Sequence, residues 1–295
     1  MRLFVTGASG FIGRAVIPEL LAAGHGVLGL ARSAAAARAV TSAGADVHRG
    51  ELADLASLEA GARATDGVIH LGFIHDFTDF EASLRTDLAA IERLGAVLEG
   101  SGRPFVVASG TLGIAPGRLA TEDMPYDARS NPRSVNALAA LGFEERGVRV
   151  SLMRFAPTVH GEGDHGFVRR FVEIAREKGA SAHIGDGSNR WNAVHRLDAA
   201  RLIRLAAENA PAGSVYHAVG EESIPTRDIA AAIGRKLGVP VVSIAPDAAA
   251  AHFGWLSWPL SLDQPASSAL TRERLKWTPT HPTLAEDLAQ DHYFT

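Results

Sequence analysis

The stretch RLFVTGASGFIGRAV, residues 2–16, determines how the chain begins to fold. Gly7, Gly10 and Gly13 follow an apolar run at three-residue intervals, and the apolar spacing over Phe11–Ala23 is typical of an amphipathic helix. In such a strand–turn–helix unit, the first glycine permits the tight turn, the second lets a pyrophosphate approach the backbone, and the third lets the helix pack on the sheet. The free N–H groups of the first helical turn then face the phosphates. The stretch predicts a dinucleotide-binding loop, although a plain turn before a helix has the same outline.

Apolar runs alternate with helical stretches through the first half of the chain. The runs are Leu3–Val5, Val27–Ala31, Val68–Phe73, Phe105–Ala108 and Val148–Phe155, and the helical stretches between them include Ala89–Leu98 and Ala137–Glu145. Strands that alternate with helices argue for a parallel sheet covered on both faces, and right-handed crossovers make that sheet doubly wound. The predicted fold class is α/β.

The alternation changes after about residue 156. APTVHGEGDHGFV, residues 156–168, is loop-like, and later segments return to short strand–helix units. We expect a dinucleotide-binding domain over residues 1–156 and a smaller, interleaved α/β substrate-binding portion over residues 157–295. Residues 191–220 are expected to return to the first domain. Trp255 and Trp258 are expected to fill the core of the smaller portion, and the alternative is that they cap the cleft.

Composition excludes several classes of function. The 295 residues are 46% hydrophobic and 21% charged, and the net charge of -4 gives no global attraction for nucleic acid or an anionic membrane. The chain has no cysteine, which excludes disulfides, zinc–thiolate sites and cysteine nucleophiles. The N-terminus reads as a strand rather than as a signal peptide, and no apolar run is long enough to span a membrane. These features fit a cytoplasmic protein without membrane or nucleic-acid partners.

The end of the second strand indicates which dinucleotide is bound. In LGLARS, residues 28–33, Ala31 occupies the position where a carboxylate would bind the ribose hydroxyls of NAD. Arg32 and Ser33 follow, and both can hydrogen-bond a 2′-phosphate. The sequence therefore favours NADP, with NAD possible. The alternative is that Arg32 is a solvated surface charge.

Seven motifs occur in the order found in extended and atypical short-chain dehydrogenase/reductases, the NAD-dependent epimerase/dehydratase group. They are TGASGFIG, HRGELADLASL, GVIHLGF, RPFVVASGT, RVSLMRFAPTVHGEG, AVHRLDAARL and SALTRERLKWTP. The chain resembles this group over nearly its whole length. The resemblance implies a Rossmann-type N-terminal domain, a smaller C-terminal domain and a substrate site between them.

The resemblance also implies which residues contact the cofactor. The implied phosphate loop is Gly7, Ser9, Gly10, Phe11, Ile12 and Gly13; Glu51 and Leu52 fall at the adenine, Leu71, Gly72 and Phe73 at the ribose, and Ser109, Pro157, Thr158 and Val159 at the nicotinamide. Leu52 and Leu71 would serve equally well as core residues.

The catalytic Tyr-x-x-x-Lys of the group is missing. One alignment places Arg129 and Arg133 at the tyrosine and lysine positions, and another places Arg133 at the tyrosine; Gly110 stands where a hydroxyl is expected. Arginine keeps a positive charge near the ribose but is a poor acid or base at neutral pH. We take Tyr126 and Thr111 as the candidate catalytic pair. The alternatives are that Tyr126 is a loop residue packed on the surface and that Thr111 supplies only a hydroxyl to a turn.

Several side chains are candidates for the substrate pocket: His75, His160, His165, Arg190, Trp191 and His195. His75 and Asp76 could transfer protons at neutral pH, or could simply form a surface turn. The acidic and histidine residues of VHGEGDHGF lack metal-ligand spacing, so no metal is expected. The sequence thus predicts an NADP-dependent oxidoreductase, monomeric or homodimeric, that acts on a small organic or sugar-like substrate. The alternative is an NADP-binding sensor without catalysis.

Overall fold

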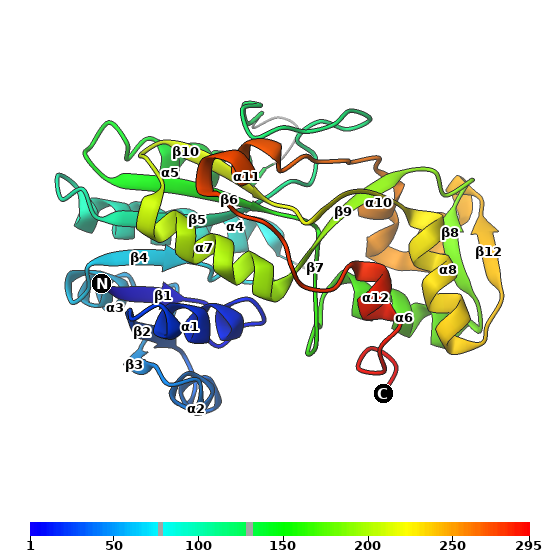
Figure 1. The fold of residues 1–295 in the computed structure, drawn as a ribbon, viewed down its shortest axis with the longest axis horizontal. Coiled ribbons are helices and arrows are strands. Elements are labelled where there is room, and N and C mark those ends of the chain that lie inside the picture. The colour runs from blue at the N-terminus through cyan, green and yellow to red at the C-terminus, as the bar shows by residue number, and fades with distance from the viewer. Residues whose placement is uncertain (76–78, 128–131) are drawn as a thin grey trace.

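A seven-stranded parallel sheet forms the centre of the protein (Figure 1). The computed structural model describes residues 1–75, 79–127 and 132–295. The strand order is β10-β6-β5-β4-β1-β2-β3. The strands are β1 (Arg2–Thr6), β2 (Gly26–Ala31), β3 (Asp46–Arg49), β4 (Gly67–His70), β5 (Pro104–Gly110), β6 (Arg149–Phe155) and β10 (Ser214–Ala218). The order reverses beside β1, and ligands of such sheets bind at this point, outside the carboxyl ends of the strands.

Helices cover both faces of this sheet. One face carries α1 (Gly13–Ala22), α2 (Ala34–Ser42) and α7 (Arg196–Asn209), and the other carries α3 (Leu55–Arg63), α4 (Phe80–Leu98) and α5 (Ser134–Leu141). Alternation along β1 explains the two layers, because Leu3 and Val5 enter the first core whereas Phe4 enters the second. The doubly wound, Rossmann-type fold predicted from the sequence is confirmed.

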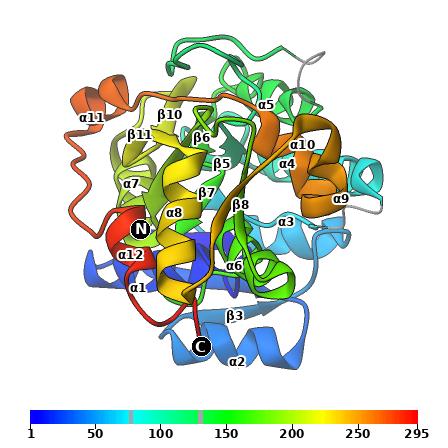
Figure 2. The ribbon, with the colours of Figure 1, turned by 90° about the vertical axis from the view of Figure 1, so that its right-hand side faces the viewer.

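A smaller lobe is built on two short sheets. These contain β7 (Thr158–His160), β9 (Arg190–His195) and β11 (Glu221–Pro225), and β8 (Ser181–Ile184) and β12 (Val241–Ile244). Its helices are α6 (Phe167–Lys178), α8 (Thr226–Leu237), α9 (Ala249–Phe253), α10 (Ser257–Ser261) and α12 (Leu284–Leu288). Figure 2 shows α6 and α8 side by side at this end, with α9 and α10 at the upper right. Trp191 and Phe171 are buried in the core of this lobe.

The chain passes repeatedly between the two lobes. After β9, α7 and β10 join the large sheet, and α11 (Ala269–Leu275) packs against both of them. Trp277 then anchors the chain to the large lobe, since its Nε1–H donates to the Asp198 carbonyl oxygen at 3.0 Å. The last segment runs from α11 back to α12 on the smaller lobe (Figure 1). The C-terminal residues therefore lie against β7 and β9 of the smaller lobe and not against the large sheet that contains β1.

The tertiary structure corrects one packing expectation. Trp255 and Trp258 are 50% and 59% exposed, so the prediction that they fill the core of the smaller portion is wrong. Phe253, Leu256 and Leu260, from the same short helices, occupy the core positions instead. Helices this short bury only one side, and adjacent residues must face outward.

Candidate functional site

The glycine loop is packed too closely to admit side chains. Gly7 has φ +67°, and a Cβ built there would come within 2.8 Å of the Gly72 backbone nitrogen. The Gly10 N–H donates to the Gly7 carbonyl oxygen at 2.9 Å, closing the turn. A Cβ on Gly13 would overlap the Gly7 carbonyl oxygen and approach the Ala8 oxygen to 2.7 Å. Because α1 begins at Gly13, the positive end of its dipole faces this loop, while the Arg14, Ala15 and Val16 N–H groups already donate to the carbonyl oxygens of Gly10 and Ile12.

A buried series of hydrogen bonds supports the glycine loop. The Gly72 N–H donates to Thr6 Oγ1 at 3.0 Å, and Thr6 Oγ1 lies 2.8 Å from His70 Nδ1. His70 Nε2 lies 3.1 Å from Asp87 Oδ1, and Asn136 Nδ2 donates to Asp87 Oδ2 at 2.7 Å. Burial alone would raise the pKa of Asp87, but the hydrogen bond and charge of His70 outweigh it and hold that pKa low. These hydrogen bonds join β1, β4, α4 and α5, and no local sequence pattern identified them.

The end of β2 lies open to solvent where the second ribose is expected. Ala31 is buried, whereas Arg32, Ser33 and Glu51 are exposed. Ser33 begins α2, and its Oγ accepts a hydrogen bond from the Ala36 N–H at 3.1 Å. Leu52 is half-buried, and a Cβ on Gly72 would lie 3.0 Å from its Cδ2 atom.

Two further arginines lie beside the glycine loop. The Arg196 guanidinium carbon is 5.3 Å from the centre of the Phe11 ring. A Cβ on Gly163 would lie 3.8 Å from Arg14 Nη2 and 3.9 Å from Arg196 Nη1. The loop after β7 thus lies against the start of α1 between two positive charges. Arg14 follows Gly13 directly, so its position was readable from the sequence; that of Arg196 was not.

Tyr126 pairs with Ser109 rather than with Thr111. The Tyr126 hydroxyl donates to Ser109 Oγ at 3.0 Å, at the carboxyl end of β5. The Arg154 guanidinium carbon lies 4.0 Å from the centre of the Tyr126 ring. Arg154 is 1% exposed, and its Nη2 donates to the Met124 carbonyl oxygen at 2.9 Å. A buried cation therefore supports both the tyrosine ring and the loop that carries it.

The Thr111 hydroxyl holds strand ends together. It donates to Asn192 Oδ1 at 3.0 Å and lies 3.3 Å from the Phe155 carbonyl oxygen, and the residue is 2% exposed. Asn192 in turn donates to the Gln264 carbonyl oxygen at 2.7 Å. These bonds connect β5 and β6 to β9 of the smaller lobe.

Arg133, Phe73 and His75 gather beyond the end of β4. The Arg133 guanidinium carbon stands 4.1 Å from the centre of the Phe73 ring, and the rings of Phe73 and His75 are 5.2 Å apart. Burial, with the nearby charges of Arg133 and His165, lowers the pKa of His75. His165 also packs edge-on against Phe11, with 5.9 Å between ring centres. Asp76 and Arg129, two residues singled out from the sequence, lie outside the described residues.

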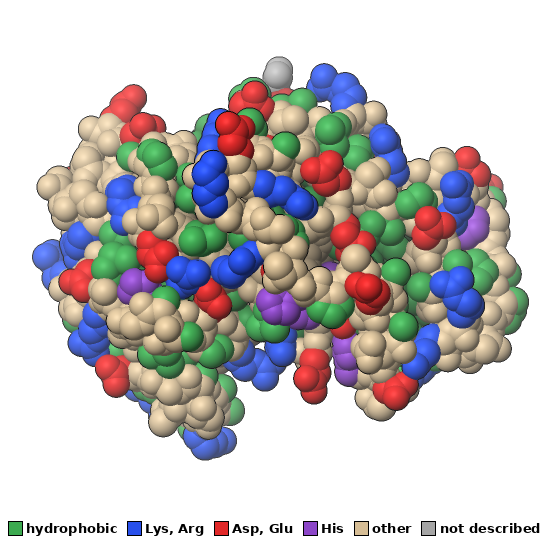
Figure 3. Space-filling model, in the orientation of Figure 1, with side chains coloured by type: hydrophobic (Ala, Val, Ile, Leu, Met, Phe, Trp, Pro, Cys, Tyr) green, Lys and Arg blue, Asp and Glu red, His purple; other side chains and the backbone are tan. Residues whose placement is uncertain are grey.

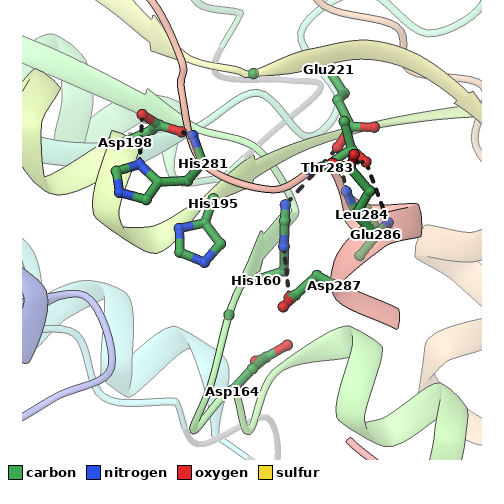
Figure 4. Close-up of polar contacts among 12 residues, drawn as sticks. His160, Asp164, His195, Asp198, Glu221, His281, Thr283, Leu284, Glu286 and Asp287 are labelled. Atoms are coloured by element: carbon green, nitrogen blue, oxygen red, sulfur yellow. Dashed lines mark hydrogen bonds and ion pairs between the residues drawn. The ribbon is translucent and has the colours of Figure 1, made fainter. Parts of the chain in front are cut away.

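His160 and His195 belong to a cluster between the lobes (Figure 4). His160 is fully buried, and its Nδ1 lies 2.8 Å from Asp287 Oδ2 on α12. His195 stacks on His281 with 5.1 Å between ring centres. Burial lowers the pKa of His195 to about 4. Figure 3 shows histidines on this face, close to where the molecule is hollowed between its lobes.

The other predicted pocket residues lie in different surroundings. Arg190 pairs with Asp263, with 2.7 Å between Nη2 and Oδ2. Trp191 is fully buried, and its ring centre lies 5.5 Å from that of Phe167. Of the residues expected at the nicotinamide, Thr158 is buried, with half-buried Pro157 and Val159 on either side. None of these contacts places Arg190 or Trp191 beside the glycine loop.

Across residues 1–75, 79–127 and 132–295, no three His, Asp or Glu side chains are arranged to hold a metal ion. Within the same residues, no helix has the length and apolar character needed to cross a bilayer.

Buried histidines predict that stability falls in acid. His217 is fully buried, and its Nδ1 lies 2.7 Å from the Ser267 carbonyl oxygen. Burial and the Arg154 charge lower the pKa of His217 to about 4, as burial does for His195, from 6.5 in the unfolded chain. Between these pH values the unfolded chain holds more protons, so stability is lost as pH falls from 6.5 towards 4. His217 alone accounts for up to about 3 kcal/mol of that loss.

Urea unfolding at several values between pH 7.5 and 4.5 measures this effect. We expect His217→Asn, which keeps an amide donor near Ser267, to reduce the pH slope of the unfolding free energy by about one proton. The slope is the informative quantity, because the substitution also lowers stability at every pH. An unaltered slope would show that His217 titrates in the folded protein as it does in the unfolded chain.

The chain is similar to known proteins in both sequence and structure. The model of the NAD dependent epimerase/dehydratase family matches residues 3–219. The chain is 48% identical over 295 residues to an uncharacterized protein of Schizosaccharomyces pombe, with all of both chains covered. It is 26% identical to a 4-hydroxy-2-methyl-3-oxo-4-farnesyl-3,4-dihydroquinoline-1-oxide ketoreductase of Stigmatella aurantiaca, covering 92% of this chain and 84% of that protein. The solved Thermus thermophilus UDP-glucose 4-epimerase complex with NAD superposes with a TM-score of 0.78 at 22% identity, covering 99% of each chain.

Proposed function

Because the chain belongs to the NAD-dependent epimerase/dehydratase family, we propose that it is an NADP-dependent oxidoreductase. Its reaction is hydride transfer between the nicotinamide and a carbonyl or hydroxyl carbon of a small organic substrate. The observation that carries the proposal is the Tyr126 hydroxyl, 3.0 Å from Ser109 Oγ at the carboxyl end of β5. That edge of the sheet is where this fold binds its ligands.

The residues around the glycine loop fit a dinucleotide. Gly7, Gly10 and Gly13 leave a backbone surface without side chains, and the N-terminus of α1 directs its partial positive charge at the pyrophosphate. Arg14 and Arg196 place positive charge beside the same loop. Exposed Arg32 can pair with a 2′-phosphate, and no carboxylate stands at Ala31 to repel one. When bound, the nicotinamide supplies or accepts the hydride.

Tyr126 serves as the general acid and base. In the direction of reduction, its hydroxyl donates a proton to the substrate carbonyl oxygen, and in oxidation the phenolate takes that proton back. The Arg154 guanidinium over the ring stabilises the phenolate that forms. Ser109 orients the hydroxyl, and its own hydroxyl can donate to the same substrate oxygen. Thr111, bonded to Asn192, acts by holding the end of β5 in place.

Arg133 replaces the lysine of the usual pair as a fixed positive charge. It lies at the start of α5 near Asp87, whose charge favours the guanidinium form, while burial lowers the pKa of Arg133. Guanidinium cannot exchange protons at neutral pH, so it holds the ribose and contributes charge only. This division leaves proton transfer to Tyr126.

Aromatic side chains near the site favour an organic substrate with an apolar body. Phe167 follows His165 closely in sequence, and its ring centre lies 5.8 Å from that of half-exposed Trp255. Phe73 and Phe11 lie on the side of the large lobe. Arg190, which could have received a phosphate, is already paired with Asp263. The quinoline ketoreductase among the relatives acts on a substrate of this chemistry.

The missing Tyr-x-x-x-Lys supports a second candidate, an NADP-binding sensor without catalysis. One experiment separates the two functions. Purified protein is first titrated with NADPH and with NADH by fluorescence to measure binding. It is then mixed with NADPH and a panel of aldehydes, ketones and quinones, and absorbance at the reduced-nicotinamide band is followed. Turnover supports the oxidoreductase, tight binding without turnover across the panel supports the sensor, and no binding of either dinucleotide rejects both.

Cofactor preference provides a direct prediction for Arg32. We expect NADPH to bind at least about tenfold more tightly than NADH, and Arg32→Ala to remove most of that difference by weakening NADPH alone. Fluorescence titration with both dinucleotides measures the two dissociation constants. Arg38→Ala, an exposed arginine on α2, is the matched control and should leave both constants unchanged. Equal loss of NADPH and NADH affinity in Arg32→Ala would contradict a role at the 2′-phosphate.

A further inference from the structure

We propose that the C-terminal residues 284–295 form a strap that holds the 161–166 loop against the glycine loop, and that Tyr293 is its positioning residue for dinucleotide binding. The proposal rests on the proposed function, since it requires a dinucleotide at the glycine loop. The strap residues lie at the C-terminal end of the sequence, and none of the contacts given for them below is with the glycine loop.

The strap is attached to the smaller lobe at two earlier points. The Leu284 N–H donates to Glu221 Oε2 at 2.7 Å. Asp287 lies 2.8 Å from His160 Nδ1, and both residues are buried (Figure 4). The hydrogen bond and charge of His160 outweigh burial and lower the pKa of Asp287, so its carboxylate stays ionised. These bonds tie α12 to β7 and β11, and direct the chain beyond it towards the 161–166 loop.

Tyr293 then fastens the loop at two points. Its hydroxyl donates to Asp164 Oδ2 at 2.9 Å and accepts from the Gly161 N–H at 3.1 Å. Tyr293 is 1% exposed, and burial together with the Asp164 charge raises its pKa, so the hydroxyl remains a donor. Arg169 Nη1 donates to the Tyr293 carbonyl oxygen at 3.0 Å. Both ends of the loop, Gly161 and Asp164–Gly166, are thereby fixed, because Asp164 Oδ1 also accepts from the Gly166 N–H at 2.6 Å.

The loop so fixed touches the cofactor region. His165 packs against Phe11 of the glycine loop, with 5.9 Å between ring centres. A Cβ on Gly163 would lie within 3.9 Å of both Arg14 and Arg196. Loosening the loop would therefore release Phe11 and the two arginines from one fixed arrangement. The entropy of ordering them would then oppose dinucleotide binding.

Tyr293→Phe tests the proposal with a matched control. It removes only the hydroxyl that bonds Gly161 and Asp164. Tyr216→Phe removes an equally buried hydroxyl, one that has no hydrogen-bond partner among the described residues. We expect the dissociation constant for NADPH to rise about tenfold in Tyr293→Phe and to stay unchanged in Tyr216→Phe. Titration of both variants by NADPH fluorescence measures the difference.

A second readout separates positioning from general support of the smaller lobe. Hydrogen exchange in the wild-type protein should slow at residues 161–166 and 284–293 when NADPH is added, because linked sites stabilise each other reciprocally. This measurement decides the matter even if Tyr293→Phe does not fold. A lower melting temperature with unchanged NADPH affinity, or exchange that NADPH leaves unaltered, would overturn the strap. Wild-type protein that binds neither dinucleotide would instead overturn the proposed function.

Discussion

Gly13→Ala is expected to lower dinucleotide affinity by at least about 100-fold. The added Cβ would overlap the Gly7 carbonyl oxygen and come within 2.7 Å of the Ala8 oxygen. Both atoms are backbone, so no side chain can rotate away and the loop itself must move. That movement displaces the N-terminus of α1, with its partial positive charge, from the pyrophosphate. It also costs about 1–3 kcal/mol of folding stability, the usual cost of overpacking.

NADPH titration of Gly13→Ala measures the loss, with circular dichroism to establish that the variant is folded. Gly26→Ala is the matched control. Gly26 lies at the opposite end of β2, and the atom nearest to a Cβ there would be Arg2 Cγ at 3.4 Å, an ordinary contact. Its affinity for NADPH should equal that of the wild-type protein. If Gly13→Ala binds NADPH normally while folded, the pyrophosphate does not lie on this loop.

Tyr126→Phe is expected to reduce kcat/KM by about 10²- to 10⁴-fold while the dissociation constant for NADPH changes by less than about twofold. The substitution removes the hydroxyl that lies 3.0 Å from Ser109 Oγ. It retains the ring that lies over Arg154, so the loop keeps its support. A loss in turnover without a loss in cofactor binding is the signature of a missing acid or base.

Steady-state kinetics on a substrate identified from the carbonyl panel, together with NADPH titration, measures this split. Ser109→Ala should lower turnover less, because it leaves the tyrosine hydroxyl in place. Tyr216→Phe serves as the control for loss of a tyrosine hydroxyl away from the site and should retain wild-type turnover. Wild-type activity in Tyr126→Phe would assign proton transfer to another group, such as His75.

Local sequence patterns predicted the large lobe well. The alternation of apolar runs and helical stretches identified β1, β2, β4, β5 and β6 of the large sheet. The predicted helical stretch Ala89–Leu98 lies within α4, and both end at Leu98. The short strand β3, Asp46–Arg49, was not predicted, because its DVHR sequence has little apolar character and pairs only with β2.

The candidate catalytic pair illustrates where sequence reasoning stopped. Tyr126 and Thr111 were chosen for their hydroxyls and their positions after β5. The structure gives the Tyr126 hydroxyl to Ser109 and the Thr111 hydroxyl to Asn192. Which of two neighbouring hydroxyls meets a loop residue depends on side-chain alternation along β5 and on the path of a loop that has no periodic pattern.

By itself, the sequence determined the parallel sheet, the glycine loop after β1 and the absence of a carboxylate after β2, because these features depend on residues adjacent in the chain. The tertiary structure alone decided the contacts between distant segments. It placed Arg154 against the Tyr126 ring, Asp87 beside His70, and Tyr293 beside Asp164. Such pairs are separated by 17 to 129 residues, and no local propensity encodes them. They form because buried polar groups must find partners once the two lobes have excluded water.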